Sequence, residues 1–226
     1  MRFSRLALGI CLVLCSLAAF SQNDSKVQVF GGYSFLHLDS GGISNAVLDP
    51  SGTFTMKNNF SGWTGEFQYN VTDWGGIVAD VSGNYGTRVS APASSGFTGI
   101  PSGSSYTFMV GPVVQQSAGK LRPFAHVLFG FDRQDTDLAS AAASLSTGLS
   151  TFPTPTNAKD TAFAMAMGGG VDWKAGRHIS LRLGQIDYLY TAHDYSMESA
   201  ELGAVSNFTH QNNFRFSTGV VFNLGR

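Results

Sequence analysis

Eight stretches of the chain alternate apolar and polar residues in steps of two, which is the periodicity of a β-strand with one apolar and one polar face. The clearest stretch lies near the C-terminus, where Phe214, Phe216 and Phe222 interleave with Arg215 and Asn223. The other seven cover residues 27–38, 60–71, 77–85, 105–116, 122–132, 162–173 and 179–190. The pattern predicts an all-β fold.

The stretch over residues 179–190 changes phase in its middle. Its apolar face begins with Leu181 and Leu183, but beyond Gly184 the apolar positions are Ile186 and Tyr188. One extra residue in a strand produces such a change, because it turns every following side chain to the opposite face. We therefore expect a β-bulge close to Gly184.

The connections between the strands alternate between short and long. Three are tight turns, around residues 72–75, 117–119 and 174–177, and four run over about 39–59, 87–104, 133–160 and 192–211. Long polar loops are unusual in one compact soluble domain, whereas outer-membrane barrels have short periplasmic turns and long extracellular loops. Since the long connections are rich in Ser, Gly, Thr, Ala and Pro, we expect mobile tips rather than a packed subdomain.

The first 21 residues form a separate segment. Arg2 and Arg5 precede a short apolar run, and Ala19 and Ser21 are small residues at the expected cleavage site, so we expect an export signal over residues 1–21 and a barrel domain over residues 22–226. Both cysteines of the chain, Cys11 and Cys15, would leave with the signal, which excludes disulfides and Cys-ligated metals. The formal charge of −1 gives no reason to expect a nucleic-acid partner.

These observations predict an all-β, eight-stranded antiparallel up-and-down transmembrane β-barrel with its apolar face toward lipid. A closed barrel satisfies every backbone N–H and C=O in hydrocarbon, and each stretch is long enough to cross the apolar layer. Trp74 and Trp173 fall near the short-turn end, and Tyr85, Tyr106 and Tyr190 fall toward the loop end. The expected aromatic girdle comprises Trp63, Trp74, Tyr85, Tyr106, Trp173, Tyr188 and Tyr190.

Charged residues fall almost entirely on the polar face, which would line a narrow lumen where an unpaired charge is costly. We expect one interior network of Glu66, Asp80, Arg122 and Arg182. Asp187 and Arg215 would form a second pair at a greater height if the bulge turns Asp187 inward. His126 is expected to be a hydrogen-bonding partner in the interior. The predicted interior set is Glu66, Asp80, Arg122, His126, Arg182, Asp187 and Arg215.

Three segments resemble the small outer-membrane barrels of the OmpA and OmpX type, and the porin-family outer membrane protein beta-barrel domain. They are the opening Val29–Phe35, the turn Asp73–Gly76 and the closing Phe214–Phe222, and the likeness extends over essentially the whole mature chain. Many such barrels end on an aromatic residue, whereas Leu224, Gly225 and Arg226 follow Phe222 here. The resemblance implies an outer-membrane location, with lipids and the barrel assembly machinery as partners.

The sequence favours a non-enzymatic barrel with a structural or surface-interaction role carried by four external loops, which would meet an extracellular ligand. Alternatives are a narrow channel or transporter for small solutes, a soluble lipocalin-like periplasmic binder with inverted faces, and a membrane-embedded lipid hydrolase or acyltransferase. No catalytic group, cofactor site or metal motif is predicted. A weak metal site at His193 and His210, which flank the last long loop, is a further hypothesis.

Overall fold

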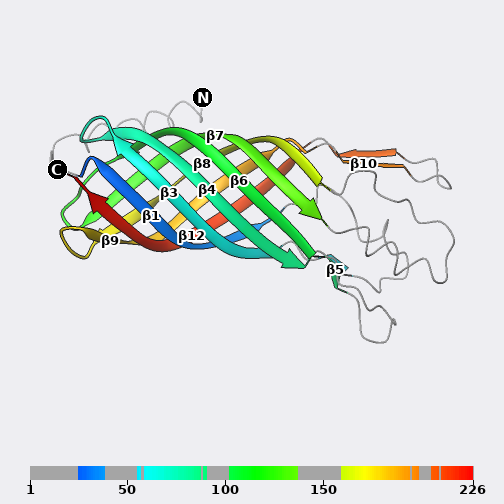
Figure 1. The fold of residues 1–226 in the computed structure, drawn as a ribbon, viewed down its shortest axis with the longest axis horizontal. Helices are drawn as coiled ribbons and strands as arrows, with labels where there is room; N and C mark the ends of the chain where they lie inside the picture. The colour runs from blue at the N-terminus through cyan, green and yellow to red at the C-terminus, as the bar shows by residue number, and fades with distance from the viewer. Residues whose placement is uncertain are drawn as a thin grey trace, which may run out of the picture.

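Eight strands close into an antiparallel barrel in the computed structural model, which confirms the predicted fold (Figure 1). The structure describes residues 25–38, 55–56, 59–87, 89–90, 102–136, 159–193, 195–198, 205–208 and 210–225. The barrel strands are β1 (Val27–His37), β3 (Asn59–Asn70), β4 (Gly75–Thr87), β6 (Ser102–Gln115), β7 (Leu121–Thr136), β8 (Lys159–Lys174), β9 (Ile179–Thr191) and β12 (Gln211–Leu224). Around the barrel their order is β1, β12, β9, β8, β7, β6, β4 and β3. No helix among these residues is long and apolar enough to cross a membrane.

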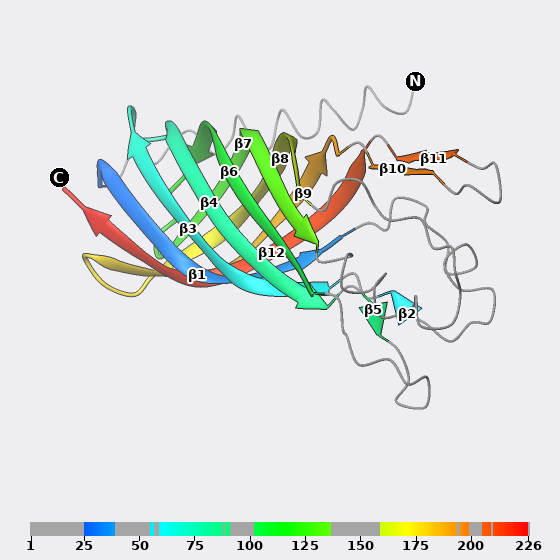
Figure 2. The ribbon, with the colours of Figure 1, turned by 45° about the vertical axis from the view of Figure 1, so that its right-hand side comes forward.

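Four shorter strands lie beyond the loop end of the barrel. β2 (Thr55–Met56) pairs with β5 (Val89–Ser90), and β10 (Tyr195–Glu198) pairs with β11 (Val205–Phe208). Figure 2 shows both pairs past the ends of the long strands. Backbone pairing therefore extends into these parts of the long connections, and the expected mobility of their tips stays a prediction. The expected export signal lies outside the described residues.

The first and last strands of the barrel close it along one continuous seam. β1 pairs with β12 from Val27 opposite Leu224 to His37 opposite Phe214. At the middle of the seam Gly32 lies directly opposite Gly219. A Cβ on Gly32 would lie 2.2 Å from the carbonyl oxygen of Thr218, and one on Gly219 would lie 2.3 Å from that of Gly31. The two backbones approach this closely because both positions lack a side chain.

The two faces of the wall differ sharply in polarity. Large apolar side chains cover the outside, and Phe67, Phe129 and Ile186 are 53%, 46% and 63% exposed. Positions of the opposite parity point into the barrel, where charged and amide side chains such as Glu66 and Gln185 are buried. A soluble lipocalin has the opposite arrangement, so the lipocalin-like alternative does not agree with this wall.

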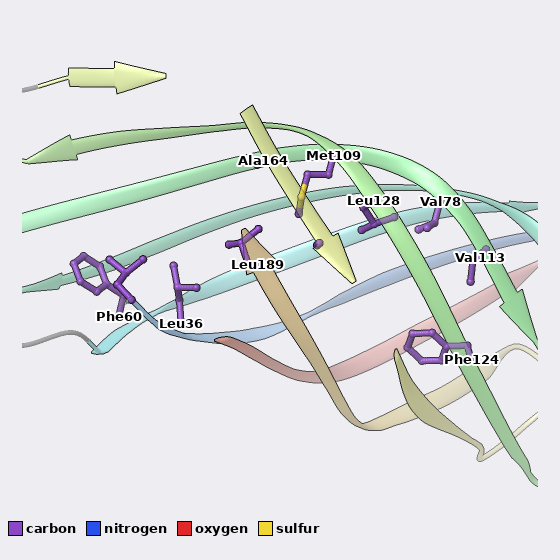
Figure 3. Packing of buried hydrophobic residues seen from close by; sticks show 11 residues of the cluster. Leu36, Phe60, Val78, Met109, Val113, Phe124, Leu128, Ala164 and Leu189 are labelled. Carbon is purple, nitrogen blue, oxygen red and sulfur yellow. The ribbon is translucent and has the colours of Figure 1, made fainter. Parts of the chain in front are cut away.

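The interior also contains apolar side chains. Figure 3 shows nine of them pointing into the barrel from its wall: Leu36, Phe60, Val78, Met109, Val113, Phe124, Leu128, Ala164 and Leu189. The sequence pattern did not reveal this cluster, because most of these residues lie in short continuous apolar runs, where inward and outward positions look alike. Eight-stranded barrels have an interior that side chains fill completely, so apolar groups can pack there as in a core.

The predicted bulge in β9 is confirmed by the strand register. Val171 pairs with Gly184, but the next residue, Asp172, pairs with Arg182, so Leu183 has no partner in this ladder. The register of β12 against β9 shifts at the same level. Because of the extra residue, Arg182 and Asp187 both face the interior although they are separated by an odd number of positions.

Candidate functional site

The first interior network lies toward the short-turn end and joins two guanidinium groups through a shared carboxylate. Arg182 donates from Nη1 to Glu66 Oε2 at 2.6 Å and from Nε to Asp172 Oδ1 at 2.9 Å. Arg122 donates from Nη2 to the other oxygen of Asp172 at 3.1 Å, and from Nη1 to Asn223 at 3.2 Å. These residues come from five different strands, so the network ties opposite parts of the wall together.

Aromatic rings cover both sides of the Arg182 guanidinium. Its Cζ atom lies 4.0 Å from the centroid of Phe30 and 4.3 Å from that of Phe124, at distances typical of cation–π interactions. Glycines make room for the rings: a Cβ on Gly32 would lie 2.8 Å from Phe30 Cζ, and one on Gly170 would lie 2.9 Å from Phe124 Cζ. The bare inner positions of β1 and β8 therefore allow the rings to pack against Arg182.

The second interior network is centred on Arg215. This guanidinium bonds to both oxygens of Asp80, at 2.8 and 3.1 Å, and to Asp187 Oδ2 through Nε and Nη2, at 3.0 and 2.9 Å. Asp187 Oδ1 is 2.8 Å from Nε2 of His126. Gln185 connects the two networks, because its amide oxygen accepts from Arg182 and its amide nitrogen donates to Asp187.

A third group lies toward the loop end and is centred on Asp132. Its carboxylate is 2.9 Å from Nε2 of His193, and it accepts hydrogen bonds from Ser105 at 2.8 Å and from Gln134 at 3.0 Å. Gln134 also donates to Gln211 at 3.2 Å. Polar side chains therefore occupy the barrel near its wide loop end as well as at mid-height.

Amide side chains fill the interior at the short-turn end. Gln68 donates to Gln115 at 2.9 Å and to Asn70 at 2.7 Å, and Gln28 donates to Gln115 at 3.5 Å. Across all levels, the buried ionisable groups are Glu66, Asp80, Asp132, Asp172, Asp187, Arg122, Arg182, Arg215, His126 and His193. None of them is more than 5% exposed, so buried ionisable groups occupy the interior at several heights beside the apolar cluster.

All seven residues of the predicted interior set lie inside the barrel, although their grouping differs from the expected one. Asp80 belongs with Arg215 and Asp187, not with Glu66, because the long Arg215 side chain reaches across the lumen from β12 to β4. The expected isolated pair of Asp187 and Arg215 is thus part of a larger network. Any functional role of these residues beyond packing stays a prediction.

Sequence reasoning omitted several residues that complete the networks. Asp172 links two arginines, and Asp132 bonds to His193, yet neither carboxylate was placed in the expected set. Both lie on the polar parity of their strands, so alternation alone would have placed them inside. Gln185 has the same parity as Asp187 beyond the bulge, so the expected change of phase would have placed it inside as well.

The predicted girdle residues all lie on strands or turns of the barrel, with outward-facing side chains. Trp63, Trp74 and Trp173 are 47%, 65% and 38% exposed. Tyr85 and Tyr106 meet edge to face, with ring centroids 5.7 Å apart, and Tyr188 meets Phe214 in the same manner at 5.7 Å. The remaining member, Tyr190, stacks on His210 with centroids 5.9 Å apart.

The hypothesis of a metal site at His193 and His210 is wrong. His193 is buried and bonds to Asp132, whereas His210 is exposed on the outside against Tyr190. The two imidazoles therefore lie on opposite sides of the wall. Within the described ranges no group of three or more His, Cys, Asp or Glu side chains is arranged to hold a metal ion.

Comparison with known proteins supports the fold. No family model and no curated protein sequence matches the chain. Among solved structures, the outer membrane protein OprG from Pseudomonas aeruginosa matches 91% of this chain over 99% of its own length, with 12% identity and a TM-score of 0.53. Neisserial surface protein A (12% identity, TM-score 0.48) and the attachment invasion locus protein Ail of Yersinia pestis (10%, 0.48) match 90% and 88% of this chain over their entire lengths. At 12% identity the likeness to OprG shows the architecture alone, that of an outer membrane protein barrel.

Proposed function

We propose that this chain is a non-enzymatic barrel of a bacterial outer membrane, with a sealed interior and a structural or surface-interaction role carried by its long connections. In this proposal residues 1–21 are removed during export and residues 22–226 form the mature domain. The short turns and both chain ends face the periplasm, and the long connections face the exterior. Outer-membrane lipids and the barrel assembly machinery are its expected partners.

The observation that carries the proposal is the filled interior. Arg215 and Arg182 each reach carboxylates on other strands, and every ionisable side chain of the networks is buried. The inner alanines of β8, on which a narrow channel would depend, are also buried, and Ala164 and Ala166 pack in the apolar cluster. Acid–base pairs such as His126 and Asp187 are sealed away from any substrate, which argues against catalysis.

Planar-bilayer recording tests whether the barrel is sealed. Because the networks occupy the lumen at several heights, we expect the purified protein to insert without producing large, stable conductance steps. The double variant Arg182→Ala, Arg215→Ala has smaller side chains at two of these heights. If it folds, its conductance in the same bilayers serves as the comparison. Regular open-channel steps from the unmodified protein would refute the sealed interior.

Cysteine labelling in intact cells tests the orientation. The mature chain contains no cysteine once residues 1–21 are removed, so single cysteines can be introduced without interference. A membrane-impermeant maleimide should label Ser146→Cys, in the third long connection, in intact cells. It should label Ala175→Cys, in a short turn, only after the outer membrane is opened. The reverse pattern would overturn the proposed orientation.

The external role is proposed for the long connections because the ionisable groups inside the described part of the barrel are buried. Deleting residues 139–156 removes most of the longest connection and leaves every barrel strand in place. Loss of binding to a host or envelope surface by this variant, with unchanged barrel stability, is the result expected if this connection carries the contact.

A further inference from the structure

Basic side chains form a continuous arc along part of the short-turn rim. They are Lys26, Lys120, Lys174, Arg177 and His178, which we call the basic arc. Backbone hydrogen bonds place their segments next to one another: Lys26 N bonds to Gly225 O at 3.2 Å, Asn223 N to His178 O at 2.8 Å, and Lys174 N to Lys120 O at 2.7 Å. The arc thus follows the ends of β1, β12, β9, β8 and β7, which are neighbours in the barrel.

The basic arc contains no acidic residue. None occurs in the described segments that form it, which are residues 25–26, 117–121, 173–179 and 223–225. Two carboxylates are nearest in the sequence: Asp172 points into the barrel and bonds to Arg122 and Arg182, and Asp24 lies outside the described residues. Asp73 lies on the turn between β3 and β4, in the remaining part of the rim. Among the described residues, one side of this rim therefore has more basic than acidic side chains.

An apolar band lies directly beside the basic arc on the outer face of the same strands. Leu121, Trp173, Ile179 and Leu224 are 45%, 38%, 44% and 49% exposed. Lys26, Lys120 and Arg177 are exposed at the adjoining rim. Cations next to an outward apolar surface match the two parts of a phospholipid, a charged headgroup and acyl chains.

We propose that the basic arc binds the phosphate groups of anionic phospholipids, whose acyl chains lie along the apolar band. The proposal rests on the membrane location proposed above and adds a lipid class and a defined part of the rim. Near a membrane surface each Lys or Arg favours anionic over neutral lipid by about fivefold. The preference should weaken in high salt, because the screening length shortens to roughly 3 Å at 1 M.

Single-tryptophan reporters test this inference, because the chain has three tryptophans and two of them lie at the short-turn end. The double variant Trp63→Phe, Trp74→Phe retains Trp173 on the basic arc. The matched control, Trp63→Phe, Trp173→Phe, retains Trp74 on the part of the rim that carries Asp73. Each is reconstituted in vesicles containing phosphatidylcholine and phosphatidylglycerol, with bromine on the acyl chains of one lipid at a time. Fluorescence quenching then gives the relative association constant of the two lipids.

We expect Trp173 to report a preference for phosphatidylglycerol of about fivefold or more, and Trp74 to report a ratio near one. Replacing the exposed residues Lys26, Lys120 and Arg177 by Gln should lower the Trp173 ratio at least fivefold, whereas Arg133→Gln at the opposite end should leave it unchanged. Equal ratios at both reporters, or a ratio that survives the triple replacement, would overturn the lipid site. Quenching by phosphatidylcholine alone verifies that each variant is embedded, and a chain quenched by neither lipid would overturn both this inference and the membrane location.

Discussion

Replacing Arg215 by Met removes the charge at the centre of the second interior network while preserving most of the side-chain length. Arg215 is 1% exposed and makes five hydrogen bonds, four of them to carboxylate oxygens. Without it, Asp187 keeps contacts to His126 and Gln185, but the only other side-chain donor to Asp80 within the described residues is Thr64, at 3.2 Å. Asp80 is therefore the group that the substitution affects most.

The expected loss of unfolding free energy follows from the burial of these charges. Removing one partner of a buried ion pair typically costs about 3–5 kcal/mol, because the other charge remains in the interior uncompensated. A second substitution, Asp80→Asn, removes that stranded charge, so the double variant should recover roughly half of the loss. Asp80→Asn alone should cost less than Arg215→Met, since Arg215 retains Asp187.

Urea unfolding in lipid vesicles, followed by tryptophan fluorescence, measures these differences. Arg133→Met is the matched control, because Arg133 is exposed on the outside of β7, and we expect it to change stability by less than about 0.5 kcal/mol. If Arg215→Met unfolds within about 0.5 kcal/mol of the unmodified protein, or if Asp80→Asn makes it worse, the ionic network does not stabilise the barrel in the way inferred here.

Two further substitutions test the packing of the wall. Gly170→Ala should lower the free energy of unfolding by roughly 1–3 kcal/mol in the same urea assay, because the new Cβ would lie 2.4 Å from the Gly184 carbonyl oxygen. The control Gly31→Ala should be nearly neutral, since no atom lies within 4 Å of its Cβ. Equal effects of the two substitutions would count against the close approach at Gly170. Phe129→Arg should lower the free energy of unfolding by about 2–4 kcal/mol if this outward position contacts the middle of the lipid layer. The control Phe129→Leu should lower it much less. A tolerated arginine would argue that the outer face contacts water.

The fold was predictable because the alternation of faces is a local property of each strand. Each outward residue such as Phe216 is flanked in sequence by inward residues such as Arg215, and this relation needs no knowledge of neighbouring strands. The bulge near Gly184 was also visible, since it reverses the alternation within one stretch. The same local rule placed the seven expected interior residues inside.

The partners of those residues could not be predicted in the same way. Contacts inside a barrel depend on how far each strand is displaced along its neighbour, and the alternation pattern contains no information on that displacement. Asp80 lies beside Glu66 in the strand ladder, yet its ion-pair partner is Arg215. Apolar inward residues such as Leu128 were missed for another reason, because next to Phe129 they are indistinguishable from the lipid-facing set.

Because Arg215 lies on β12, the negative charges of Asp80 and Asp187 gain their shared cation only when this last strand joins the barrel. The carboxylates that this guanidinium holds belong to β4 and β9, both of which precede β12 along the chain. Until β12 docks between β1 and β9, Asp80 and Asp187 face a nascent barrel that lacks their shared cation. An incomplete barrel is therefore penalised electrostatically as well as by its open edges, and biogenesis favours the complete eight-stranded form over truncated intermediates.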